Sequence, residues 1–145
     1  MFRIETQADE ERRRLVRQRL RESNSRSSPV MAELRGTPSD SEVPVEVYAF
    51  DGDRLNGGLV GEAWGFWLHI RLLWVEESAR GSGLGSRLMA AAEEHARDRL
   101  GCVNSRVETF DFQAPGFYRK LGYNHVGKIE DYPPGCTEHL FVKRL

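Results

Sequence analysis

The clearest pattern of apolar and polar positions lies between residues 68 and 100. Apolar side chains alternate at Leu68, Ile70, Leu72 and Trp74, which predicts a strand with these four on one face. Leu73 and Val75 make the last part of this strand apolar on both faces, as in a strand that is covered on both sides. Downstream, a spacing of four predicts one face of an amphipathic helix, formed by Leu84, Leu88, Ala92, Ala96 and Leu100.

The rest of the chain predicts short elements of both kinds. Thr6 precedes a predicted helix at 7–22, and a Ser-, Pro- and Gly-rich loop with one helical turn near 30–35 follows at 23–41. Further strands are expected at 2–5, 43–50, 59–64, 103–110, 123–132 and 137–144, and a short helix at 113–121 that stops at Gly122. This order predicts a single α+β domain over 1–145, with a mixed, mainly antiparallel sheet of about six to seven strands.

Charge and composition exclude several classes of function. The net charge is −1, and the six arginines of the first helix are interspersed with acids, so we expect a solvated helix face and no nucleic-acid partner. No apolar run approaches membrane length, so no membrane partner is expected. Cys102 and Cys136 match no metal-ligand pattern; we interpret them as reduced thiols of a cytoplasmic protein without a metal.

A glycine-rich turn, from Arg80 to Gly85, separates the central strand from its helix. Alternating glycines let a backbone approach a ligand closely, and the free amides at a helix start favour a phosphate. A P-loop is disfavoured because no lysine follows, and a dinucleotide-binding turn because the third glycine comes one residue early. A tight structural turn remains the alternative to a phosphate site.

Two segments resemble the GCN5-related N-acetyltransferase (GNAT) family. Arg80-x-x-Gly83-x-Gly85 is similar to the family's acetyl-CoA-binding motif, and residues 108–123 (ETFDFQAPGFYRKLGY) resemble its second core segment. Together they cover about half of the chain and suggest a small stand-alone member of bacterial type. The resemblance implies two central strands that splay apart to admit the pantetheine arm of acetyl-CoA.

The resemblance also implies roles for particular residues. The pantetheine arm would pair with the backbone near Trp74 and Val75, where a backbone N–H would face the acetyl oxygen. The pyrophosphate would bind the amides of Arg80, Gly81, Ser82, Gly83, Leu84, Gly85 and Ser86. Tyr118 stands where the family's thiolate-protonating tyrosine stands, although a tyrosine of the core would look the same in sequence. Gln113 stands near the place of a family asparagine that bonds the cofactor.

The general base is less closely specified. His69 lies on the central strand where several members of the family carry a base, and histidine titrates near neutral pH. A structural, hydrogen-bonded histidine is the alternative, with Glu62, Glu76, Glu108 or ordered water as the base. Arg71 could instead recognise a carboxylate on the acceptor.

The sequence therefore predicts an enzyme that moves an acetyl group from acetyl-CoA to a primary amine of a small molecule or a peptide. A non-catalytic acetyl-CoA sensor or interaction module is the alternative. We also expect a possible homodimer, and the loop at 23–41 is a candidate lid over the acceptor.

Overall fold

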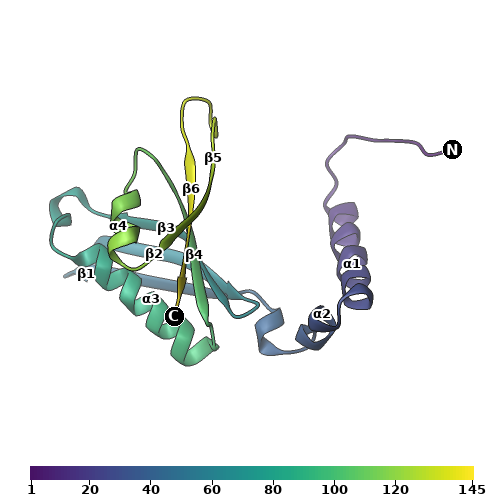
Figure 1. Cartoon of the computed structure of the whole chain (residues 1–145), viewed down its shortest axis with the longest axis horizontal. Helices are drawn as coiled ribbons and strands as arrows, with labels where there is room; N and C mark the ends of the chain where they lie inside the picture. Colours follow the sequence, from purple (N-terminus) through teal and green to yellow (C-terminus); the bar gives the residue numbers. More distant parts are fainter. The chain divides into compact units, whose positions relative to one another are not determined.

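A computed structural model describes all residues from 1 to 145 (Figure 1). The contacts divide the chain into two compact units, Met1–Asp40 and Ser41–Leu145, which are described separately below. No helix in either unit is sufficiently long and apolar to cross a membrane.

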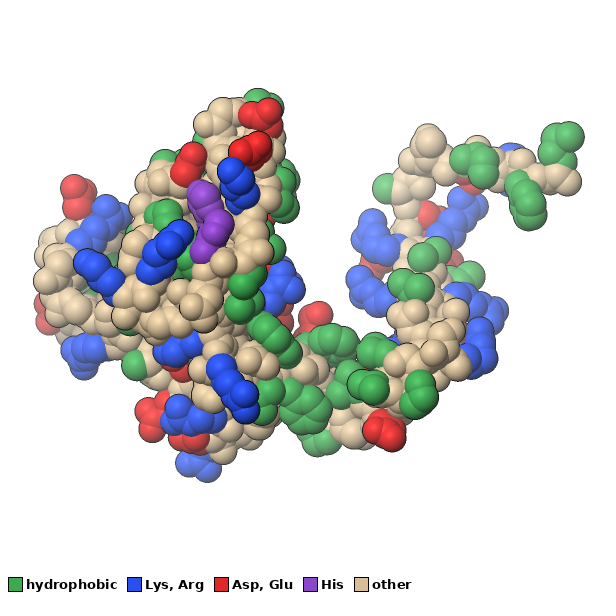
Figure 2. All heavy atoms as spheres, in the orientation of Figure 1, with side chains coloured by type: hydrophobic (Ala, Val, Ile, Leu, Met, Phe, Trp, Pro, Cys, Tyr) green, Lys and Arg blue, Asp and Glu red, His purple; other side chains and the backbone are tan.

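The N-terminal unit is helical over most of its length. α1 (Glu10–Ser27) begins after Asp9, whose side chain accepts a hydrogen bond from the Arg12 amide at 2.8 Å. Such a cap fixes the start of a helix, so the helix begins three residues after its predicted start and extends beyond its predicted end. α1 buries none of its side chains, and basic side chains gather along it in Figure 2. The predicted strand at 2–5 is wrong, because Phe2 and Ile4 are exposed and pair with no strand.

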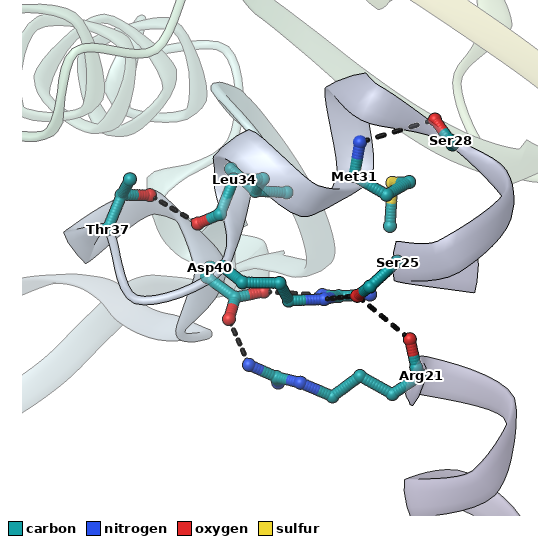
Figure 3. A network of polar contacts seen from close by, with 8 residues as sticks. Arg21, Ser25, Ser28, Met31, Leu34, Thr37 and Asp40 are labelled. Carbon is teal, nitrogen blue, oxygen red and sulfur yellow. Dashed lines mark hydrogen bonds and ion pairs between the residues drawn. The ribbon is translucent and has the colours of Figure 1, made fainter. Parts of the chain in front are cut away.

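The segment expected to be a polar loop is mostly helical too. α2 (Pro29–Leu34) contains the predicted turn and is followed by η1 (Pro38–Asp40). Asp40 forms ion pairs with Arg21 and with Arg35, the latter at 2.7 Å, and Figure 3 shows the Arg21 guanidinium beside the Asp40 carboxylate. Burial works against ionisation of Asp40, but the hydrogen bond from Arg35 and the charge of Arg21 hold its pKa below the usual value.

The second unit is a six-stranded sheet in the order β1-β2-β3-β4-β6-β5. β1 (Val43–Asp51), β2 (Arg54–Trp64) and β3 (Trp67–Val75) form an antiparallel meander, and β4 (Asn104–Phe110) lies parallel to β3. β6 (Glu138–Arg144) is antiparallel to both β4 and β5 (Asn124–Ile129). The predicted α+β class and mainly antiparallel sheet are confirmed.

The core lies between the sheet and α3 (Leu84–Leu100), which packs across β1, β2 and β3 (Figure 1). The predicted helix face is confirmed: Leu88, Ala92 and Ala96 are buried, and Leu84 and Leu100 pack against the core. A second short helix, α4 (Pro115–Lys120), brings Tyr118 into the same core and ends just before Gly122, as expected.

The alternation predicted along β3 is wrong after Ile70, because the strand contains a β-bulge. Leu72 pairs with Val60 and Ile70 with Gly61, so Arg71 is an extra residue without a partner on β2. An extra residue moves all later side chains to the other face. Leu68 and Ile70 are therefore buried, whereas Leu72 and Trp74 are 64% and 45% exposed and Leu73 packs against the core in their place.

Gly61 permits this bulge, because a Cβ at this position would lie 2.4 Å from the carbonyl oxygen of His69. We predict that Gly61→Ala lowers the free energy of unfolding by about 1–3 kcal/mol, since the bulge must shift to relieve the overlap. Gly127→Ala, in β5, is the matched control, because a Cβ there meets nothing within 4 Å. Urea unfolding would show equal losses for the two variants if the bulge did not depend on glycine.

Candidate active site

β3 and β4 part in the middle of the sheet. Only their first residues pair: Trp67–Ile70 of β3 lie opposite Asn104–Val107 of β4. Beyond these pairs, β3 continues to Val75 and β4 to Phe110 without pairing between the two strands. Beyond this fork, the edge of β3 that faces β4 carries backbone N–H and C=O groups without a strand partner. Such an edge can hydrogen-bond an extended ligand that contains amides. The predicted splay of the central strands is therefore present.

The glycine turn supplies free amides beside this edge. Gly81 and Gly83 have φ of 77° and 82°, a conformation that side chains rarely adopt. Gly83 is the N-cap of α3 and no side chain caps the helix, so its first amides remain available to an anion. The Arg80 Nε donates to the Val75 carbonyl oxygen at 3.3 Å, which draws the guanidinium back toward the end of β3. The residues present thus fit the pyrophosphate that the sequence predicts here.

Tyr118 lies on the α3 side of the sheet, within an aromatic cluster. Its ring centroid is 5.1 Å from that of Phe117, 6.0 Å from Tyr123 and 6.1 Å from Phe141. Burial raises the pKa of Tyr118 to about 12, so the phenol stays protonated at neutral pH. Its hydroxyl has no partner in the protein, and no fully buried polar atom lacks one. The hydroxyl is therefore within reach of solvent or a ligand.

His69 lies on the opposite face of the sheet, beside the fork. Its Nε2 is 2.7 Å from Glu108 Oε2, and Arg106 donates to the other carboxylate oxygen at 2.5 Å. Burial alone would raise the pKa of Glu108, but the hydrogen bonds from His69 and Arg106 outweigh it and lower that pKa to about 2. An ionised carboxylate can only accept a hydrogen bond, so Nε2 carries a hydrogen, and Nδ1 is the nitrogen that can exchange a proton with a ligand.

The other two acids among the candidate bases, Glu62 and Glu76, lie in different surroundings. Glu62 lies beside His69, with Oε1 3.7 Å from Nδ1, too far for a hydrogen bond. Arg71 donates to the same Glu62 oxygen at 2.7 Å, so its guanidinium is already occupied by a carboxylate of this chain. Glu76 lies apart from this group, where it accepts from the Glu77 amide and pairs with Arg54.

Gln113 is held by the end of β4. Its side-chain oxygen accepts from the Thr109 hydroxyl at 3.1 Å and from the Phe110 amide at 2.9 Å. Only its amide NH₂ group is left for a ligand. The sequence alone did not predict that the Gln113 side chain would bond the end of β4. The short spacing between Phe110 and Gln113 was the signal that could have indicated it.

The site defines a class of protein. An uncapped helix start that suits a diphosphate lies beside a free strand edge that suits an amide-containing arm. Tyr118 lies on one face of this sheet and His69 on the other. These features suit an elongated acyl thioester that carries phosphates, and the class is an acyl-CoA-dependent transferase.

Comparisons with known proteins agree with this class. The model of the acetyltransferase (GNAT) family matches residues 7–123. A blasticidin-S acetyltransferase of Streptomyces morookaense is 54% identical over 131 residues, which cover 88% of this chain and 96% of that protein. The crystal structure of an acetyltransferase from Bacillus cereus ATCC 14579 has a TM-score of 0.83 at 30% identity, covering 99% of this chain and 98% of its own.

A more distant structure shares the fold. It is an aminoglycoside 6'-N-acetyltransferase complexed with coenzyme A, with a TM-score of 0.64 at 20% identity, and the match covers 90% of this chain and 91% of that one. This chain belongs to the acetyltransferase (GNAT) family. It is an N-acetyltransferase that uses acetyl-CoA, as the sequence predicts.

The low pKa of Glu108 has a consequence for stability. A carboxyl group with a pKa lowered in the folded state stabilises the fold above its unfolded pKa of about 4.5, and this contribution is lost as the pH falls toward 2. We predict that Glu108→Gln flattens the fall in the free energy of unfolding between pH 5 and pH 3. Urea unfolding at several pH values measures this slope.

Glu77→Gln is the control, because Glu77 is an exposed acid with no ion pair in the structure. The control should keep the slope of the unchanged protein. Identical slopes for both variants and the unchanged protein would mean that His69 and Arg106 do not hold Glu108 ionised.

Proposed function

We propose that this enzyme acetylates a primary amine of blasticidin S or of a closely similar antibiotic. The observation that carries the proposal is the 54% identity to a blasticidin-S acetyltransferase, which extends over 96% of that protein. A match over nearly the whole length includes the segments around the fork as well as the glycine turn. Identity at this level supports a shared acceptor more strongly than a shared fold does.

In this proposal, acetyl-CoA lies along β3 and the start of α3. The backbone of Trp74 and Val75 pairs with the pantetheine arm, and a backbone N–H of this free edge polarises the acetyl carbonyl. The pyrophosphate binds the free amides of the turn, which belong to Gly81, Ser82, Gly83, Leu84, Gly85 and Ser86. The Arg80 amide was also expected to take part, but it donates to the Glu77 carbonyl oxygen at 3.2 Å. The free NH₂ group of Gln113 donates to the cofactor. The splayed strands and the uncapped helix start support this placement.

His69 acts as the general base. Glu108 holds the Nε2 hydrogen of the neutral ring, so Nδ1 can take a proton from the acceptor ammonium, directly or through water. Glu62 Oε1 is 3.7 Å from Nδ1, and its negative charge favours a cation at this point. Direct attack then forms the C–N bond and breaks the C–S bond within a ternary complex, and the attacking nitrogen loses its remaining surplus proton to solvent.

Tyr118 donates its hydroxyl proton to the departing thiolate. A pKa of about 12 makes the phenol a weak acid, but the burial that raises it would also raise the basicity of a thiolate beside it. The products are free CoA and the N-acetylated amine, and the tyrosinate recovers a proton from solvent. The reachable hydroxyl without a partner in the protein supports this role.

The proposal also includes a cytoplasmic homodimer. α1 carries exposed apolar side chains at Leu15, Val16 and Leu20 and buries none of them, which supports contact with a second copy. A single monomeric species in analytical ultracentrifugation would contradict this part.

Removing the proposed acid tests the mechanism. Tyr118→Phe should lower kcat for acetylation of blasticidin S by about 10²-fold or more, since general acid catalysis contributes this much. Acetyl-CoA should still raise the midpoint of thermal unfolding as much as it does for the unchanged protein, because the phenol does not bind the cofactor. Release of CoA thiol measures turnover, and mass spectrometry identifies the product. Tyr48→Phe, at an exposed tyrosine of β1, is the control.

Replacing His69, the proposed base, should change how kcat depends on pH in the same assay. His69→Gln should lower kcat at neutral pH and recover activity as rising pH deprotonates the amine without help.

Full turnover by Tyr118→Phe would contradict the proposed role of Tyr118 as the acid. Acetylation of other amines but not of blasticidin S would leave the enzyme class intact and contradict the proposed acceptor.

A further inference from the structure

Three aromatic side chains form a surface at the end of β4, called here the aromatic shelf: Phe110, Phe112 and Tyr132. The rings of Phe110 and Phe112 are stacked, with centroids 5.3 Å apart and planes within 5° of each other. Tyr132, from the turn between β5 and β6, lies against Phe110 at 6.4 Å. Phe112 is 68% exposed and Tyr132 54% exposed. Rings that stack on each other while remaining exposed still have flat faces to offer a ligand.

Backbone hydrogen bonds hold the shelf in place. The Phe110 amide donates to Gln113 Oε1 at 2.9 Å, and the Asp111 amide donates to the Thr137 carbonyl at 3.0 Å, which fastens the end of β4 to the β5–β6 turn. Within that turn, the Tyr132 amide donates to the Cys136 carbonyl at 3.0 Å. The backbone that carries the rings is thus fixed before any ligand arrives, which reduces the entropy lost on binding.

The shelf lies next to the proposed catalytic face. The side chains of Ser105, Val107 and Thr109 are buried on the α3 side of β4, so Glu108 and Phe110 both leave the opposite face. Residues two apart on a strand are separated by about 7 Å, so the ring of Phe110 begins one such step from the carboxylate that holds His69. A ligand with a ring on the shelf and an amine at His69 needs only a short linker between them.

The size of the shelf suits a small ligand better than a protein. An aromatic side chain carries roughly 150–250 Å² of surface, and two half-exposed rings offer only a few hundred square ångströms. A stable protein interface needs about 800 Å² per partner. Glu62 and Glu108 each have an arginine partner, Arg71 and Arg106. Beside the shelf, Asp111, Asp131 and Glu138 have no ion pair, so the local charge is negative and favours a cationic amine over a polyanion.

We propose that the aromatic shelf is an acceptor subsite that stacks a flat, unsaturated ring of the substrate while the substrate's amine reaches His69. The inference rests on the proposed function and names the chemical class of its acceptor: a primary amine joined by a short linker to a planar ring. Aromatic stacking also sets specificity, because a puckered ring of the same size cannot lie flat against Phe112 and Tyr132.

Two amines of equal length separate planarity from size. With saturating acetyl-CoA, the unchanged enzyme should use 2-phenylethylamine about tenfold better in kcat/KM than 2-cyclohexylethylamine. Phe112→Leu and Tyr132→Leu keep an apolar side chain but remove the flat face. Each should raise KM for 2-phenylethylamine about tenfold, while kcat, KM for acetyl-CoA and the use of 2-cyclohexylethylamine stay unchanged. The variants should likewise raise KM for blasticidin S if its recognition uses a flat ring.

Phe50→Leu is the matched control, because Phe50 is an equally exposed phenylalanine on β1, at the far edge of the sheet from β5. Equal use of the two amines, or a ring preference that survives both shelf variants, overturns the subsite and leaves the proposed function standing. Absence of CoA release with every amine overturns the proposed function and this inference with it. Unchanged thermal midpoints show that the shelf variants remain folded.

Discussion

The parting of β3 from β4 after Ile70 and Val107 is the constraint on which the site depends. A buried sheet normally pairs every backbone N–H and C=O, so strands that separate within a sheet leave polar groups that need a partner. In this chain the free edge of β3 leads directly to the uncapped start of α3. The unpaired edge suits a ligand arm with amide groups, and the uncapped helix start suits an anion at the end of that arm.

The bulge at Arg71 divides β3 into two parts with different tasks. Before it, Leu68 and Ile70 anchor the strand in the core while His69 projects toward Glu62 and Glu108. After it, Leu73 and Val75 take over the core contacts, so Leu72 and Trp74 are exposed beyond the fork. One strand therefore fixes His69, the proposed base, by packing upstream and has an unpaired backbone edge downstream, where we propose that the cofactor binds. Gly61 on the neighbouring strand makes this change of phase possible.

Local patterns made much of this fold predictable. The four-residue period of α3, the alternation in β1 and the glycine turn depend on nearby residues and appear in the structure. The alternation through Leu72 and Trp74 failed because a bulge is a property of two paired strands, although Gly61 inside a strand was a signal for one. The contact of His69 with Glu108 spans 39 positions, so the sequence could suggest both residues as bases but not their pairing. Tyr132 contacts Phe110 across a gap of 22 positions that no periodicity reveals.

Hydrogen exchange with and without acetyl-CoA tests most directly whether the fork holds the cofactor. Binding should slow exchange at those amides of Leu72–Val75 that face away from β2 and at the amides of Gly81–Ser86, because the ligand supplies partners that these amides lack in the protein. The amides of β1 should exchange at unchanged rates, and NAD should give no protection. Slowed exchange confined to other parts of the chain, or none at saturating acetyl-CoA in the folded protein, would contradict a cofactor site between β3 and β4.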